Sequence, residues 1–390
     1  MNLKDKSYIM PTYGKRTLEF LYGKGAYLYT KQNQKFLDFG SGIAVTSLGH
    51  ANKKLIKALN QQSSKLWHTS NLYFSKAQEN YAKILCKHSF ADKVFFTNSG
   101  AESIECGLKV VKSYHYNKKN NKKNIITFEG SFHGRTFAAM SAQKNKKYSS
   151  GFEPLLPGFI KVPFNDLNAL EKKINKSTAA ILLETIQGEG GIRPFSIYFL
   201  EEIKKICLKN DILLFLDEVQ CGFGRSGKLF SYQWSKIKPD VMATAKGIGS
   251  GFPMGACLAT SRSSIGMKKG MHGSTFGGNN LAVAVGTAVI NQIMSKDFLE
   301  KVDKTARYLW FKLKELEDKN DFITDVRGAG LLLGIKTKRK NTEVCKMLEK
   351  KRVLTIPASD NIIRLAPPLI IGNKEVDILI SAIEKVLSKK

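Results

Sequence analysis

One lysine and one aspartate in the middle of the chain have the types and spacing that covalent catalysis requires. Asp217 ends an apolar run, Ile212–Leu216, and Lys246 follows 29 residues later, between Ala245 and the glycines of Gly247–Gly251. A lysine amine among small residues can form an imine with a carbonyl group. A carboxylate at the end of a buried strand can pair with a protonated pyridine nitrogen and keep the ring electron-poor. Together they predict a site for pyridoxal 5′-phosphate (PLP), with Lys246 and Asp217 as its catalytic residues.

Two turns rich in hydroxyl groups and glycine could bind a phosphate. In Thr97–Ser103, Ser99 is a suitable N-cap for a helix, and Glu102 three residues later completes a capping-box pattern. Free backbone N–H groups at such a helix end bind phosphate, and Gly100 permits close approach. Gly273–Asn279 offers two further hydroxyl groups. A simple capped helix and an ordinary loop are the alternatives, but the PLP residues favour the phosphate interpretation for the first turn.

The segment Phe132–Thr136 carries an aromatic ring, a histidine and an arginine that follow a predicted strand. Phe132 could stack on a planar cofactor ring. Arg135 could hold a substrate carboxylate with its planar guanidinium. His133 fits a packed core histidine as well as a catalytic one.

A second group of charged residues consists of carboxylates at a turn and one distant arginine. Glu184, Gln187 and Glu189 surround a glycine-rich turn after a strand, where they could orient a cofactor, hold a mobile arginine or cap the turn. Arg364 lies in an apolar segment, and a buried unpaired charge is costly, so it needs a carboxylate from the protein or from a substrate. We hypothesise that Glu189 pairs with Arg364.

The glycine-rich run Gly222–Gly227 resembles two nucleotide-binding motifs without meeting their requirements. It matches G-x-G-x-x-G after a strand, but no helix start and no acidic residue about 20 positions on support dinucleotide binding. Read as a P-loop ending at Lys228, it has Leu229 where Ser or Thr is required. We therefore predict neither activity for this run.

Strands that alternate with helices must position these residues. The predicted strands are Lys93–Thr97, Asn124–Phe128, Ala179–Glu184, Ile212–Leu216, Val241–Thr244 and Gly255–Thr260, and the predicted helices between them include Ala101–Tyr116 and Ser196–Lys209. Such alternation predicts an α/β fold with a mostly parallel sheet that is covered on both faces. After about Asn279 the pattern changes to long helices and short strands, which predicts a smaller α+β domain at the C-terminal end.

Size and charge are compatible with an ordinary globular enzyme. The chain has 390 residues, of which 43% are hydrophobic, and a formal net charge of +29. The basic residues are mostly lysines scattered along the chain, so we expect solvated faces that attract anionic substrates rather than a nucleic-acid site. The six cysteines contain no C-x-x-C pair, which predicts reduced thiols, no disulfides and no metal site. Met1–Met10 has no apolar core of a signal peptide and no 18-residue apolar run occurs, so we expect a cytoplasmic protein without a membrane span.

Taken together, these motifs resemble the class III (ornithine-type) PLP-dependent aminotransferases of fold type I. The resemblance runs over nearly the whole chain and is most specific in Leu216–Gly227 and Lys246–Gly255. Within this family the branch that acts on acetylornithine is the most similar, because of Trp67–Tyr73, Phe132–Arg135 and Gln187–Gly191. The resemblance implies a large domain with a mostly parallel, seven-stranded sheet at 49–279, a small domain at 280–390, and an N-terminal segment, 1–48, that joins the small domain.

The family pattern also implies a role for each matching residue. Lys246 would bind the cofactor and shuttle the proton, Asp217 would pair with the pyridine nitrogen, and Gln220 would reach the ring hydroxyl. Gly100 and Ala101 would bind the phosphate through their N–H groups, and Phe132 would stack on the ring. Thr275 would bind the phosphate of the neighbouring subunit's cofactor, which implies a homodimer. The substrate residues would be Arg135 and Ser274 for acetylornithine, Arg364 for 2-oxoglutarate and Glu189 as the movable partner of Arg364.

The activity implied by this branch is transfer of the δ-amino group of N2-acetylornithine to 2-oxoglutarate in arginine biosynthesis, with glutamate as the second product. Succinyldiaminopimelate is a further possible donor. Ornithine or 4-aminobutyrate aminotransferases of the same class remain alternatives, as does an aminomutase of the same fold. The net charge alone would suggest a nucleic-acid-binding protein, for which the motifs give no support.

Overall fold

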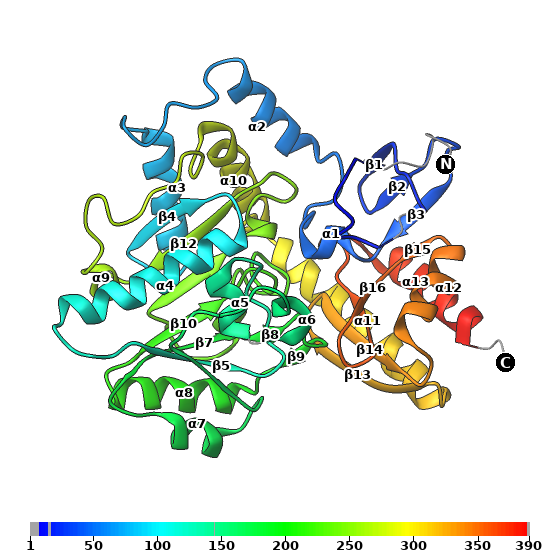
Figure 1. Ribbon diagram of the computed structural model, residues 1–390. Coiled ribbons are helices and arrows are strands. Elements are labelled where there is room, and N and C mark those ends of the chain that lie inside the picture. The colour runs from blue at the N-terminus through cyan, green and yellow to red at the C-terminus, as the bar shows by residue number, and fades with distance from the viewer. Residues whose placement is uncertain (1–7, 15–16, 144, 388–390) are drawn as a thin grey trace.

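The computed structural model describes residues 8–14, 17–143 and 145–387. The prediction about a signal peptide therefore falls largely on residues outside this description. Figure 1 shows two bodies, a larger one around a central sheet and a smaller one near which both ends of the chain lie. Among the described helices, none combines the length and the apolar character that a membrane span requires.

A seven-stranded sheet forms the centre of the larger body, as the family resemblance implies. The strands follow the order β4-β12-β11-β10-β7-β5-β6, and only β12 runs antiparallel to its neighbours. They are β4 (Lys93–Thr97), β5 (Asn124–Phe128), β6 (Phe159–Val162), β7 (Thr178–Glu184), β10 (Leu213–Asp217), β11 (Val241–Thr244) and β12 (Gly255–Ala259). Because β7 and β10 are parallel and in register, Glu184 and Asp217 end side by side at the same edge of the sheet.

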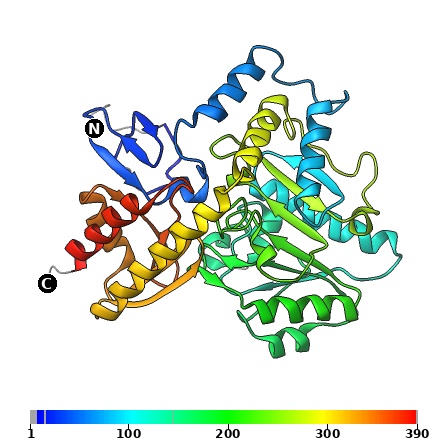
Figure 2. The ribbon, with the colours of Figure 1, turned by 180° about the vertical axis from the view of Figure 1, so that it is seen from behind.

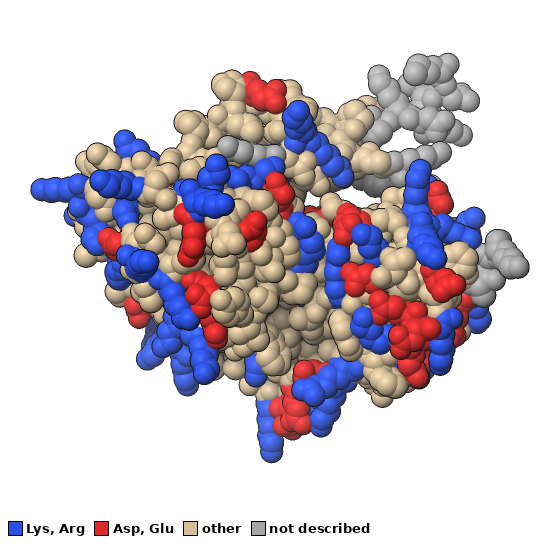
Figure 3. Space-filling view, turned by 90° about the horizontal axis from the view of Figure 1, so that it is seen from below, with Lys and Arg blue, Asp and Glu red and all other residues tan. Residues whose placement is uncertain are grey.

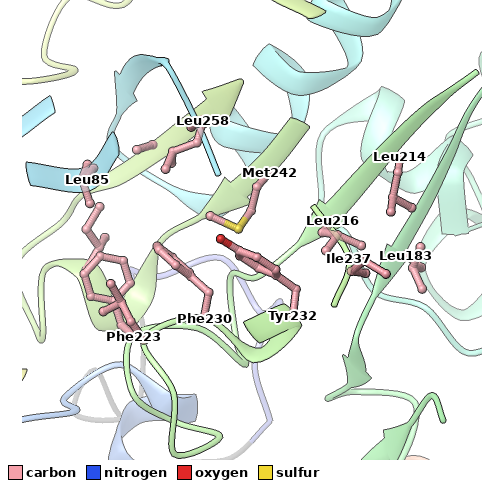
Figure 4. Close-up of a cluster of buried hydrophobic side chains, with 14 of the residues drawn as sticks. Leu85, Leu183, Leu214, Leu216, Phe223, Phe230, Tyr232, Ile237, Met242 and Leu258 are labelled. Atoms are coloured by element: carbon pink, nitrogen blue, oxygen red, sulfur yellow. The ribbon is translucent and has the colours of Figure 1, made fainter. Parts of the chain in front are cut away.

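Both faces of the sheet are buried, since successive side chains of a strand point to opposite sides. Leu214 and Leu216 of β10 contact one core, which Figure 4 shows with Met242 and Leu183 from the strands on either side. Leu213 and Phe215 belong to the core on the other face, beneath α4. The helices and short elements of this body are α2 (Lys53–Ser63), α3 (Lys76–Lys87), α4 (Gly100–Asn117), α5 (Phe137–Gln143), α6 (Lys146–Ser149), α7 (Leu167–Lys173), β8 (Ile186–Gln187), β9 (Arg193–Pro194), α8 (Ile197–Lys209), η2 (Ser231–Trp234), η3 (Lys246–Ile248), α9 (Ser261–Ser264) and α10 (Asn280–Ile293).

The smaller body combines an antiparallel sheet, four described helices and the N-terminal strands. Its sheet has the order β13-β14-β17-β16, and a second sheet, β1-β2-β3-β15, joins the N-terminal segment to the C-terminal part through the parallel pair β3–β15. Figure 2 shows the long helix α11 running along the back of this body toward the larger one. The elements are β1 (Tyr22–Lys24), β2 (Tyr27–Tyr29), β3 (Lys35–Asp38), α1 (Ser41–Ala44), α11 (Phe298–Lys319), β13 (Ile323–Ala329), β14 (Leu332–Thr337), α12 (Asn341–Lys350), β15 (Val353–Leu354), β16 (Ile356–Ala358), β17 (Ile362–Leu365) and α13 (Asn373–Leu387).

Packing around α10 differs from the predicted division of the chain. The sequence analysis placed this helix, at 280–293, in the C-terminal domain, because the strand pattern ends just before it. In the structure α10 packs against α2 and α3, and its buried side chains belong to the core of the larger body. Apolar periodicity shows that a helix has a buried face, but it does not identify the body that covers that face. The domain boundaries themselves stay a prediction.

Charged side chains of both signs occur on the face of the molecule shown in Figure 3. On the face shown in Figure 3, Lys and Arg are interspersed with Asp, Glu and uncharged surface over both bodies. Many of the Lys and Arg side chains there extend into solvent, where their charge is screened by salt.

Candidate active site

The predicted catalytic pair lies in one cavity of about 360 Å³ at the carboxyl ends of the strands. The first turn of α4, the turn after β5 and the ends of β7 and β10 form its walls, together with the loop around Lys246. The lining residues are Val45, Asn98, Ser99, Gly100, Ala101, Phe132, His133, Gly134, Glu184, Asp217, Val219, Gln220, Ala245, Lys246, Gly251, Phe252, Pro253 and Met254.

Asp217 is held in place by two hydrogen bonds, one to each carboxylate oxygen. Oδ2 lies 2.8 Å from Nδ1 of His133, and Oδ1 accepts a hydrogen bond of 3.0 Å from the N–H of Val219. Both side chains are buried, and His133 Nε2 has no hydrogen-bond partner among the described residues. The histidine therefore orients the carboxylate from behind, which the sequence had left undecided between a packed and a catalytic role.

Glu184 is a second buried carboxylate beside Asp217. It accepts hydrogen bonds from the backbone N–H groups of Phe132 and Gly188, at 2.8 and 3.0 Å. Burial and the negative charge of Asp217 raise the pKa of Glu184 to about 7, against the opposing effects of His133 and the two N–H donors. Through these two hydrogen bonds Glu184 connects the segment that contains Phe132 to the turn that contains Glu189.

Lys246 lines the cavity and adopts an unusual backbone conformation. Its φ is +50°, in the left-handed region that residues with a side chain avoid. Burial lowers the pKa of its amine, and the positive charge of Arg364 acts in the same direction, whereas Glu189, Asp217 and Glu184 oppose this. A lowered pKa favours the neutral amine, which is the form that can act as a nucleophile or a base.

The first turn of α4 provides the N–H groups predicted for phosphate binding. The Ser99 hydroxyl caps the helix by accepting from Glu102 N, as predicted. The Glu102 carboxylate does not complete the capping box; it accepts instead from the backbone and side-chain nitrogens of Asn98. An ideal Cβ at Gly100 would lie 2.7 Å from a methyl group of Val219, so only glycine fits against the wall of the cavity here.

Arg364 and Glu189 form the predicted ion pair across the junction of the two bodies. Arg364 Nη1 lies 2.5 Å from Glu189 Oε1 and donates a second hydrogen bond of 3.0 Å to Gln220 Oε1. Arg364 is 1% exposed, whereas the Glu189 side chain is 24% exposed. The carboxylate is therefore the more accessible partner of the pair.

The remaining predicted residues lie at or outside the rim. Phe132 lines the cavity, and the exposed Arg135 stacks over Tyr148 with its guanidinium 4.0 Å from the ring centre. Ser274 is tied to the cavity wall, because its hydroxyl accepts from Asn98 Nδ2 at 3.3 Å and from Gly277 N at 2.9 Å. Thr275 is exposed and contacts a different, small hollow beside 68–71, so this subunit does not bring it to its own cavity.

The geometry of the cavity fits PLP. One amine, two buried carboxylates, a set of helix N-terminal N–H groups and the ring of Phe132 line the same space from different walls. A somewhat larger cavity, of about 400 Å³, lies between β8, β9 and α11. Its charged lining residues among the described ones, Asp303 and Arg307, pair with each other at 2.8 Å and leave no group free for this chemistry.

A fold type I sheet with a lysine and a paired carboxylate at its carboxyl edge is the architecture of a PLP-dependent aminotransferase. The model of the family described as "Aminotransferase class-III" matches residues 11–387, so the chain belongs to the class III aminotransferases, and its cofactor is PLP. The prediction of the family, of the fold and of the cofactor is thereby confirmed.

The chain is similar to several proteins named acetylornithine aminotransferase. It is 48% identical to that of Mesorhizobium japonicum over 95% of this chain and 93% of the relative. It is 43% identical to that of Clostridium acetobutylicum over 95% of this chain and 97% of the relative. Among solved structures, N-acetylornithine aminotransferase from Stenotrophomonas maltophilia has a TM-score of 0.85 at 32% identity over 96% of both chains. Ornithine aminotransferase from Toxoplasma gondii has a TM-score of 0.93 at 27% identity over 97% and 92%.

Glu184 makes the stability of the cofactor-free protein depend on pH. Its pKa is about 7 when folded and near 4.5 when unfolded, so the folded state binds the proton more tightly. The free energy of unfolding is therefore expected to fall as the pH rises through this window. Glu184→Gln should flatten that decline, as measured by denaturant unfolding at about pH 5 and about pH 8. Glu202→Gln on the surface is the control, and an equal decline in both variants would contradict the assignment.

Proposed function

We propose that this aminotransferase transfers the δ-amino group of N2-acetylornithine to 2-oxoglutarate, as in arginine biosynthesis. The observation that carries the proposal is the combination of the Lys246–Asp217 cavity with the Arg364–Glu189 pair at its rim. The cavity supplies the groups for amino transfer. Arg364 supplies a binding group for a substrate carboxylate, and in the free protein Glu189 neutralises its charge. The relatives named acetylornithine aminotransferase support the choice of donor.

Bound PLP supplies an electron-poor ring that stabilises negative charge at the reacting carbon. Lys246 would hold the cofactor, and its amine, whose pKa is lowered by burial, would be the base that moves the proton during amino transfer. Asp217 keeps a proton on the pyridine nitrogen, and His133 keeps Asp217 oriented. Gly100, Ala101, Phe132 and Gln220 line the same cavity. The N–H groups of Gly100 and Ala101 would hold the phosphate, Phe132 would stack on the ring, and Gln220 would bind the ring hydroxyl.

The two substrates are distinguished by their carboxylates. Arg135 and Ser274, at the outer rim, bind the carboxylate end of acetylornithine. 2-Oxoglutarate has a second carboxylate, which displaces Glu189 and binds Arg364 with a bidentate contact. Glu189 thus neutralises Arg364 while the monocarboxylate donor is bound.

We further propose a homodimer in which Thr275 serves the site of the other subunit. Thr275 lies beside an exposed apolar segment, in which Leu72 is 84% and Phe74 is 81% exposed. His68 contacts Phe276 across this surface, with ring centres 5.2 Å apart. Exposed apolar patches of this kind are normally covered by a partner, and sedimentation as a monomer would contradict the proposal.

The six free cysteines suit a reducing compartment, which supports cytoplasmic location; fractionation with secreted proteins would oppose it.

A half-reaction identifies the donor. The holoenzyme is mixed with acetylornithine alone, and we expect the visible absorption band of the lysine-bound cofactor to disappear as the amino group is transferred. Ornithine, 4-aminobutyrate and succinyldiaminopimelate are tested at the same concentrations and should react with lower kcat/KM. If acetylornithine is inert while one of these reacts, the proposed donor is wrong. Turnover without 2-oxoglutarate would indicate an aminomutase.

A further inference from the structure

The loop that follows the catalytic aspartate contains a buried arginine that the mechanism above does not use. The run Gly222–Gly227 leaves β10 and forms a series of turns without a helix, and it carries Arg225. Arg225 is 1% exposed and is, with Arg364, one of the largest fully buried side chains among the described residues. A cation that the fold buries so completely needs a structural or chemical reason.

Arg225 connects the larger body to the smaller one through the backbone. Its Nη1 donates to the carbonyl oxygen of Leu331 at 3.2 Å and also to that of Pro367. In return, the carbonyl oxygen of Arg225 accepts a hydrogen bond of 2.9 Å from the N–H of Leu331. The turn before Leu331 approaches the loop so closely that an ideal Cβ at Gly330, whose φ is +59°, would lie 2.6 Å from the Arg225 carbonyl oxygen.

The two carbonyl groups that Arg225 contacts lie at one end of the strand pair that presents Arg364. Leu331 immediately precedes β14, and Pro367 follows β17 three residues after Arg364. β14 and β17 are paired, with Gly334 opposite Arg364. The guanidinium of Arg225 therefore holds together the start of one strand and the exit of the other, at the end of the strand pair that lies three positions from Arg364.

The electrostatics of Arg225 indicate a positional role rather than an ion pair. None of its hydrogen bonds to described residues goes to a carboxylate, and Nε and Nη2 have no partner among them. Burial lowers the pKa of this guanidinium, and only the charge of Asp38 counteracts that effect. An apolar side chain would avoid this desolvation cost, but it could not reach two backbone oxygens on different strands.

We propose that Arg225 is a positioning residue for the acceptor half-reaction, because it fixes the strands of the smaller body that aim Arg364 at the cavity. The inference rests on the proposed role of Arg364 in binding the dicarboxylate acceptor. Replacement of Arg225 leaves Arg135, Ser274 and the Lys246–Asp217 pair unchanged, because these residues belong to the larger body. The donor half-reaction therefore keeps its machinery, while the acceptor carboxylate meets a misplaced arginine.

The test compares Arg225→Met, which keeps an apolar stem but removes the donors, with Arg225→Lys, which keeps the charge without the planar fork. Arg262→Met, which removes a surface arginine bonded to Asp211 and Asp240, is the matched control. Each holoenzyme is assayed for the two half-reactions separately. For Arg225→Met we expect kcat/KM for 2-oxoglutarate to fall about tenfold, as for loss of a charged hydrogen bond, and kcat/KM for acetylornithine to change by less than about twofold. Arg225→Lys should recover part of the loss.

A binding measurement supports the kinetics. Glutarate, an unreactive dicarboxylate, should raise the melting temperature of the wild-type holoenzyme and of Arg262→Met more than that of Arg225→Met or Arg225→Lys. If Arg225→Met does not fold, the same comparison is made with Arg225→Lys. Equal losses in both half-reactions, or unchanged acceptor kinetics and glutarate response, would overturn the inference. A wild type that does not react with acetylornithine would instead refute the proposed donor and leave the comparison of acceptor binding intact.

Discussion

Lys246→Ala should abolish amino transfer, with a loss of at least about 10⁴-fold in kcat. The variant loses both the covalent attachment of PLP and the base that moves the proton, and no other lysine lines the cavity among the described residues. The visible band of the lysine-bound cofactor should be absent even when PLP is supplied in excess. Stopped-flow absorbance after mixing with donor measures both effects.

Lys228→Ala is a suitable control for this prediction. Lys228 is an exposed lysine on the loop after β10, and its amine lies 4.8 Å from the ring centre of Trp234. Its replacement should leave both the band and turnover unchanged. Retention of transamination by Lys246→Ala would show that a different amine carries the cofactor, and it would end the assignment of this cavity as the active site.

Asp217→Asn should slow amino transfer by about 10²–10³-fold, comparable with the loss of one preorganised electrostatic contact in other active sites. The amide has nearly the shape of the carboxylate but carries no charge, so it cannot hold a proton on the pyridine nitrogen. The cofactor should remain bound, because Lys246 and the first turn of α4 are intact. Single-turnover rates with donor alone isolate the proton-transfer step.

The matched control for Asp217 is Asp240, another buried aspartate beside the same sheet. Asp240 Oδ2 accepts hydrogen bonds from Leu214 N and Lys204, so it stabilises the strands without contacting the cavity. Asp240→Asn should lower the melting temperature and leave turnover per folded molecule near that of the wild type. The assignment of Asp217 fails if its variant turns over as fast as the control.

The sequence identified the residues of the site more completely than their contacts. Lys246 and Asp217 could be paired in advance, because a strand end and a glycine-rich loop at this spacing have few other uses. The ion pair of Glu189 with Arg364 could be anticipated because a cation in an apolar segment requires a carboxylate, and the structure contains that pair. The assigned roles in binding and catalysis stay predictions.

Contacts that depend on the order of strands could not be predicted. His133 supports Asp217 from 84 positions away, which requires that the turn after β5 reach over β7 to the end of β10. The same adjacency raises the pKa of Glu184, which the sequence presented only as one member of a polar cluster. Among the secondary-structure elements, α13 and β6 were not predicted. The predicted C-terminal domain includes α10, whose side chains pack into the core of the larger body, because a local pattern does not specify which surface an element covers.

The positive φ of Lys246 has a consequence for how this protein evolves. A residue with a side chain in that conformation costs the fold on the order of 1 kcal/mol, which glycine would not. Selection for a higher free energy of unfolding alone would therefore favour glycine at position 246. Selection for catalysis keeps the lysine, because turnover depends on its amine. Stabilising substitutions in this enzyme should accordingly be placed away from the backbone around Lys246.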